Sequence, residues 1–150
     1  MEPPSVKASW IILMIPCAIS VVLGLFVTVV PGVFIGQGYK SFLGQPWSDL
    51  VASNSNLSLY ISLHFRLMGI LMALLGALLV VIDLTAYRRG EKWAWYAFLV
   101  SSTLAWGSGL ALDAIQGLKA NVVMEAIVIL IVYVGLAISA KTMLTKTGQR

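Results

Sequence analysis

The stretch LYISLHFRLMGILMALLGALLVVI, residues 59–82, decides the fold of this chain because it is long and almost wholly apolar. About 20 such residues are enough for an α-helix to cross a hydrocarbon core about 30 Å thick. Three further stretches have the same character, at residues 10–30, 93–112 and 122–140. We therefore expect four transmembrane helices, with the longest connection, an outer loop at 31–58, between the first two.

The composition indicates an integral membrane protein: 59% of the residues are hydrophobic, 11% are charged, and the mean hydropathy is +0.93. Four spans leave little of the 150-residue chain for a domain outside the bilayer. We expect one all-α domain over residues 1–150, an integral membrane four-helix bundle with antiparallel up-down topology. The net charge is +4, and the basic residues lie at the ends of the expected helices. This distribution indicates membrane lipids as partners and argues against nucleic acid.

The basic residues predict the orientation of the bundle. If all four stretches span, both termini and the turn between the second and third spans share one side, with seven basic residues: Lys7, Arg88, Arg89, Lys92, Lys141, Lys146 and Arg150. The other side carries three, Lys40, Arg66 and Lys119. The excess of Lys and Arg on cytoplasmic loops predicts that both termini are cytoplasmic, with the chain in the plasma (inner) membrane.

Cysteine and histidine usage restricts the chemistry. Cys17 is the only thiol and His64 the only imidazole, so the chain has no intrachain disulfide or CxxC pair. One cysteine and one histidine are too few ligands for a bis-histidine haem site or for a His/Cys zinc site. We expect no metal, no cofactor and no catalytic residue.

Ionisable residues inside the spans are the candidate site. His64 and Arg66 on the second span, Asp113 on the third and Glu125 on the fourth are expected at similar depth on the outer side. Charged groups at this depth are costly and are usually paired. We expect a structural ion pair between Arg66 and either Asp113 or Glu125, with ligand binding or proton handling as the alternative. Asp83, at the inner end of the second span, is expected to be a solvated end charge.

Small residues and inner-side aromatics have expected structural roles. Small side chains let transmembrane helices approach closely, and the residues expected at helix contacts are Gly69, Ala73, Gly76, Ala77 and Gly109. Basic and tryptophan side chains near a span end bind lipid headgroups, and the expected anchors are Arg88, Arg89, Lys92, Trp93 and Trp95. In the outer loop, Pro46 favours the start of a short helix.

The stretch FRLMGILMALLGALLVVIDLTAYRRGEKWAWYA, residues 65–97, resembles small four-span membrane proteins of the DoxX-like type. The likeness rests on Arg66, on the small residues Gly69 and Gly76, and on the basic, tryptophan-rich hairpin that follows. It covers about a fifth of the chain. The resemblance implies an accessory or redox role in a membrane complex, but this sequence has no cofactor ligands that would carry a redox role.

Three functions are open. The leading one is a non-enzymatic membrane protein, an accessory or structural subunit of a complex or a self-associating bundle. The second is a bundle that binds a small apolar or amphiphilic ligand, with a polar mouth on the outer side. The third and least favoured is a lipid-modifying enzyme that uses His64 with an acid.

Overall fold

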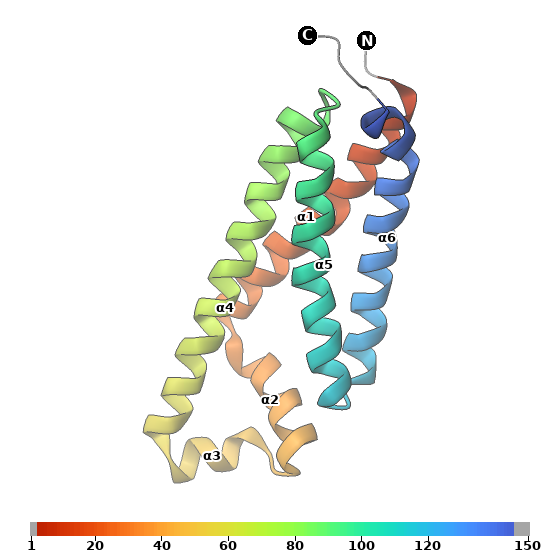
Figure 1. Ribbon diagram of the computed structural model, residues 1–150. Helices are drawn as coiled ribbons and strands as arrows, with labels where there is room; N and C mark the ends of the chain where they lie inside the picture. Colours follow the sequence, from red (N-terminus) through yellow and green to blue (C-terminus); the bar gives the residue numbers. More distant parts are fainter. Residues whose placement is uncertain (1–2, 146–150) are drawn as a thin grey trace.

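The computed structural model describes residues 3–145 as helices joined by short connections, with no strand in that range (Figure 1). The α-helices are α1 (Pro4–Val29), α2 (Pro31–Leu43), α3 (Trp47–Ser53), α4 (Ser55–Ile82), α5 (Lys92–Ile115) and α6 (Lys119–Leu144), and the π-helical turn η1 (Asp83–Tyr87) extends α4. Four of these segments, α1, α4 with η1, α5 and α6, are long and apolar enough to cross a membrane. The expectation of an all-α chain with four long apolar helices is confirmed.

The four long helices run alternately down and up (Figure 1). The start of α1 lies beside the end of α6, where the hydroxyl oxygens of Ser5 and Thr142 are 2.8 Å apart. We call this the terminal end and the opposite one, with α2, α3 and the α5–α6 turn, the far end. Lys146 and Arg150, which count toward the orientation, lie outside the described residues.

The helices form a more open arrangement than the bundle expected from the sequence. α1 packs along both α4 and α6, and α5 packs mainly on α6, whereas α4 and α5 hardly touch. Figure 1 shows α4 diverging from α5 toward the far end. The main core lies in the terminal half, where it consists of Val6, Leu13, Cys17, Leu79, Ala86, Tyr87, Ala94, Phe98, Val132, Leu136 and Met143.

Close contact between α1 and α4 depends on glycine. A Cβ atom on Gly69 would lie 2.6 Å from the carbonyl oxygen of Gly24, and one on Gly76 would lie 2.9 Å from the backbone nitrogen of Val21. A Cβ atom on Gly24 would collide with the backbone nitrogen of Ala73. Backbone contact at this distance lets two helices gain dispersion energy in lipid, where no hydrophobic drive holds them together.

The other small residues expected at contacts lie in different settings. Ala77 is exposed and faces away from the α1–α4 seam. Gly109, on α5, lies against the Glu125 carboxylate of α6, so it opposes a side chain rather than a backbone. The close approach on α4 is therefore restricted to the face that carries Gly69, Ala73 and Gly76.

The connection expected as an outer loop at 31–58 is largely helical. Pro31 begins α2 as its first residue, where the missing N–H costs nothing. Gly44 ends it with φ of 70°. The short helix expected near Pro46 is α3, and the Asn54 side chain caps α4 by accepting from the N–H of Leu57 at 3.0 Å. The sequence did not predict α2, because its glycines Gly36 and Gly38 interrupt a helical pattern.

Candidate functional site

Three hydroxyl groups meet inside the terminal half. The Tyr87 hydroxyl lies 2.6 Å from the Oγ of Ser9 and 2.6 Å from the Oγ of Ser139. Ser9 also donates to the carbonyl oxygen of Gly135 at 2.5 Å. All three hydroxyl-bearing residues are buried. The cluster joins α1, η1 and α6, and hydrogen bonds of this kind between transmembrane helices contribute about 0.6–2 kcal/mol each.

The π-helical turn places Tyr87 and Asp83 in this interior. In it the Arg88 N–H donates to the Asp83 carbonyl oxygen, five residues back, at 3.1 Å. Such wide turns are rare and frequently occur at functional sites. Gly90, with φ of 72°, then reverses the chain into α5.

Asp83 is fully buried, so the expectation that it is a solvated end charge is wrong. Neither carboxylate oxygen has a hydrogen-bond partner within residues 3–145. The reason for the error is geometric: the second span was expected to end at residue 82, but the helical segment continues to Tyr87 and carries Asp83 into the core. A buried acid in a transmembrane helix is costly, which makes Asp83 a functional candidate.

Two of the expected headgroup anchors contact the protein instead. The Arg88 guanidinium lies over the Trp10 ring, 4.7 Å from its centroid, in a cation–π contact. The half-buried Trp95 donates from its indole N–H to the carbonyl oxygen of Leu136 at 2.9 Å. Trp95 therefore ties α5 to α6, a role that the sequence alone did not indicate.

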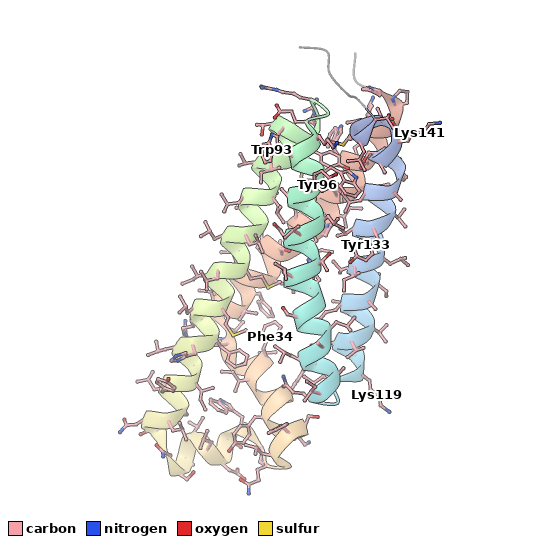
Figure 2. The ribbon with its side chains drawn as sticks, in the orientation of Figure 1. Phe34, Trp93, Tyr96, Lys119, Tyr133 and Lys141 are labelled. Carbon is pink, nitrogen blue, oxygen red and sulfur yellow. The ribbon has the colours of Figure 1, made fainter. Side chains whose placement is uncertain are left out.

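The remaining anchors are exposed at the terminal end. Arg89, Lys92 and Trp93 all have exposed side chains. Figure 2 shows Trp93 and Tyr96 toward the end that carries Lys141, whereas Lys119 lies at the opposite end. This arrangement suits lipid headgroups and the aromatic belt at one membrane boundary.

The expected cluster of four ionisable residues is divided between two helix pairs. Arg66 is exposed on α4, and its Nη1 donates to the carbonyl oxygen of Thr28 on α1 at 2.8 Å. No ion pair joins Arg66 to Asp113 or Glu125 among the residues that the structure describes. The physical reason is the divergence of α4 from α5, together with an accessible carbonyl in the last turn of α1.

His64 and the two acids lie apart from this contact. The exposed His64 ring forms a hydrogen bond through Nδ1 with the carbonyl oxygen of Tyr60, one turn back, at 2.9 Å. It also contacts the Tyr60 ring in a tilted arrangement, with the ring centroids 4.1 Å apart. Glu125 is half-buried beside Gly109, and its Oε2 atom has no hydrogen-bond partner within the described chain. A ligand-binding role for these residues stays a prediction.

The chemistry open to these groups is limited. The described residues contain no group of three His, Cys, Asp or Glu side chains arranged to hold a metal ion. General acid–base catalysis needs a base and an acid within reach of one substrate. The contacts found for the His64 ring are those to Tyr60. The buried hydroxyl cluster of Ser9, Tyr87 and Ser139 is a structural tie between spans. Asp83 is buried in the same half of the molecule but forms no hydrogen bond through its carboxylate within residues 3–145.

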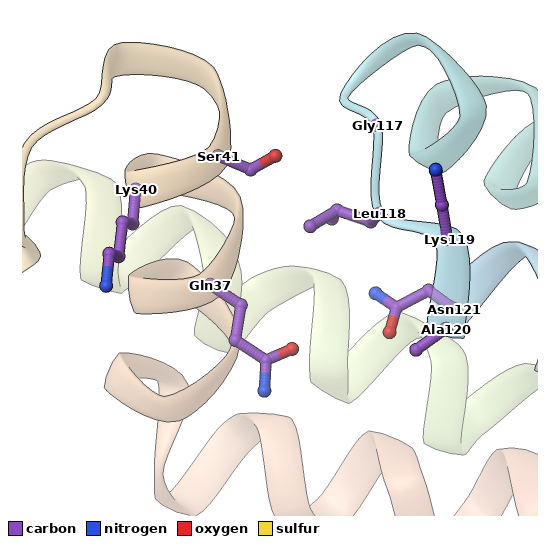
Figure 3. A pocket seen from close by; sticks show the side chains of 8 residues that line it. All are labelled: Gln37, Lys40, Ser41, Gly117, Leu118, Lys119, Ala120 and Asn121. Carbon is purple, nitrogen blue, oxygen red and sulfur yellow. The ribbon is translucent and has the colours of Figure 1, made fainter.

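The far end carries an open groove of about 590 Å³ between α2 and the start of α6 (Figure 3). Its lining residues are Gln37, Lys40, Ser41, Gly117, Leu118, Lys119, Ala120 and Asn121. Ser41 donates from its hydroxyl to the carbonyl oxygen of Gln116 at 2.7 Å, which joins α2 to the α5–α6 turn. Because α2 was not expected, nothing in the sequence indicated that these residues would meet.

Comparison with known proteins finds no match, whether against protein-family models, curated proteins or solved structures. The resemblance of residues 65–97 to DoxX-like proteins therefore stays a hypothesis.

Proposed function

We propose that this chain is a non-enzymatic subunit of a membrane protein assembly and that α5 makes the contact with a neighbouring transmembrane helix. The observation that carries the proposal is the poor cover of α5. Only 11% of the most apolar stretch of α5 is buried, against 22–28% for the other three spans. α5 is also the least apolar of the four. A span with these two properties is poorly matched to lipid and suits a protein partner.

One flank of α5 is suited to such a contact. Ser101, Ala105 and Ser108 are spaced four and three residues apart and so lie on one side of the helix. Ala105 and Ser108 are exposed. α4 does not cover this helix, because it packs on α1 instead. A row of small side chains with hydroxyl groups lets a second helix approach and form hydrogen bonds across the contact.

Membrane orientation is part of the proposal. The excess of basic residues at the terminal end supports a cytoplasmic location for both termini. The exposed Arg89, Lys92 and Trp93 at that end also support it, because cytoplasmic leaflets are rich in anionic lipid. The far end, with α2 and α3, then lies on the outer side.

Site-specific photo-crosslinking in native membranes tests the α5 contact. The photoreactive residue benzoylphenylalanine replaces Ser108 in one variant and Leu130, which is 62% exposed on α6, in the other. We expect a protein adduct at position 108 and lipid adducts alone at position 130. An adduct of twice the chain mass identifies self-association, and a different mass identifies another subunit. Lipid adducts alone at position 108 would refute the proposal.

A further inference from the structure

The carboxyl group of Asp83 is enclosed by the terminal half of the protein. The exposed fraction of the side chain is 0%, and neither carboxyl oxygen has a hydrogen-bond partner within residues 3–145. Burial of an ionised carboxylate without a partner costs several kcal/mol. A neutral polar group in the same setting costs only about 1–3 kcal/mol. The difference favours a carboxyl group that keeps its proton while the fold is closed around it.

The charged and titratable groups around Asp83 do not replace a hydrogen-bond partner. Those within electrostatic reach are Tyr87 and Arg88 on the same turn and the Cys17 thiol on α1. Arg88 is the cation among them, but Asp83 accepts no hydrogen bond from it. The other described charged side chains at this end are exposed or bound elsewhere: Lys7, Arg89, Glu91, Lys92 and Lys141.

The π-helical turn η1, which carries Asp83, is fixed to its neighbours largely by one side chain. Tyr87, four residues after Asp83, lies 2.6 Å from the hydroxyl oxygen of Ser9 on α1 and 2.6 Å from that of Ser139 on α6. α4 is held against α1 separately, by its glycine contacts. The turn can therefore separate from α1 and α6 while the rest of α4 stays in place.

Water and lipid headgroups are close to this turn. Arg89, six residues after Asp83, is exposed at the terminal end, and Gly90 with φ of 72° reverses the chain just beyond it. Six residues of a helix span about 9 Å. A local unwinding of η1 is thus enough to carry the carboxyl group from the core to the membrane boundary, where water solvates its charge.

We propose that Asp83 is a proton-binding site that controls the packing of η1 against α1 and α6. With the proton bound, the turn is packed as in this structure. When the carboxyl O–H bond breaks and the proton passes to water, the turn separates from α1 and α6 and the carboxylate reaches the terminal end. Water is the only other reactant. This inference goes beyond the α5 contact and does not depend on it.

Hydrogen–deuterium exchange of the full-length protein in mild detergent, read by mass spectrometry at several pH values, tests the proposal. Rates are first corrected for the intrinsic effect of pH on exchange. An exposed aspartate is ionised above about pH 4. Because opening releases one proton, the open population should then rise by up to about tenfold per pH unit. We expect the protection of residues 83–90 to fall accordingly, whereas that of residues 60–70, in the far half of α4, stays constant.

Two variants show whether Asp83 is the group that loses the proton. Asp83→Asn cannot ionise, so it is expected to keep the turn protected at every pH. Asp83→Ala, which is also neutral, takes its place if the amide variant does not fold. Asp49→Asn removes an exposed acid on α3 and is the matched control, expected to keep the pH dependence of the original chain.

Three results would overturn the proposal. The first is protection of residues 83–90 that does not change with pH in the original chain. The second is the same pH dependence in the original chain and in the neutral Asp83 variant, or its loss in Asp49→Asn. The third is an equal pH dependence at residues 60–70, which would assign the effect to unfolding of the whole protein.

Discussion

The Nη1 atom of Arg66 lies 2.8 Å from the carbonyl oxygen of Thr28 and joins α4 to the last turn of α1. The carbonyl groups of a last helical turn have no partner within their own helix and carry partial negative charge. Arg66 therefore stabilises the end of α1 and needs no carboxylate.

This contact predicts the outcome of a double-mutant cycle. Arg66→Met is expected to lower the free energy of unfolding by about 1–2 kcal/mol, because a charge-assisted hydrogen bond is lost. Combining it with Asp113→Asn or Glu125→Gln is expected to give additive effects within about 0.5 kcal/mol. Unfolding in mixed detergent micelles measures these values. A coupling energy well above that limit would restore the ion pair expected from the sequence.

Gly69→Leu is expected to separate α1 from α4. A Cβ atom at Gly69 already lies 2.6 Å from the carbonyl oxygen of Gly24, and larger side chains in a packed seam cost about 1–3 kcal/mol or more. The melting temperature in mild detergent should fall clearly. Ala77→Leu, on an exposed face of the same helix, is the matched control and should leave it unchanged. Equal melting temperatures for both variants would rule out the seam.

Tyr87→Phe is expected to destabilise the terminal half. The variant removes the hydroxyl group that bridges Ser9 and Ser139 and keeps the ring. We expect a loss of about 1–2 kcal/mol in the free energy of unfolding. Tyr96→Phe, at an exposed ring, is the control and should change it by less than about 0.5 kcal/mol. The prediction fails if both variants behave alike.

Asp83→Asn is expected to raise thermal stability. The side chain keeps its shape, and the variant removes a carboxylate that is fully buried and has no hydrogen-bond donor in the described chain. Removing such a charge eliminates a desolvation penalty of at least about 1 kcal/mol. Thermal unfolding of the two proteins side by side is the measurement. A lower melting temperature for Asp83→Asn would show that the carboxylate is stabilised in the fold.

Labelling of single cysteines in intact cells tests the orientation. In a Cys17→Ala background, Asn56→Cys at the start of α4 is expected to react with a membrane-impermeant maleimide. Arg89→Cys, at the terminal end, is expected to react only after the membrane is opened. Both positions are exposed in the structure, so access depends on the side of the membrane. The reverse pattern would invert the proposed topology.

The helices of this chain could be predicted from the sequence, whereas the surroundings of its candidate site residues could not. The short helix after Pro46 followed from proline chemistry, and four long helices followed from apolar length. The burial of Asp83 did not follow, because a helix end is uncertain by several residues and one further turn moves an acid from water into the core. The partner of Arg66 could not be predicted from the sequence either, because the pattern of residues along one helix does not show which other helix lies beside it.

By itself the sequence determined that this chain forms four long apolar helices, since each span is decided by local length and hydrophobicity. Only the tertiary structure decided that α1 lies between α4 and α6, that α5 is left poorly covered, and that Ser9, Tyr87 and Ser139 meet. The physical reason is that helix pairing depends on which small residues let two backbones approach, and that rotation about each helix axis then fixes which polar groups face inward.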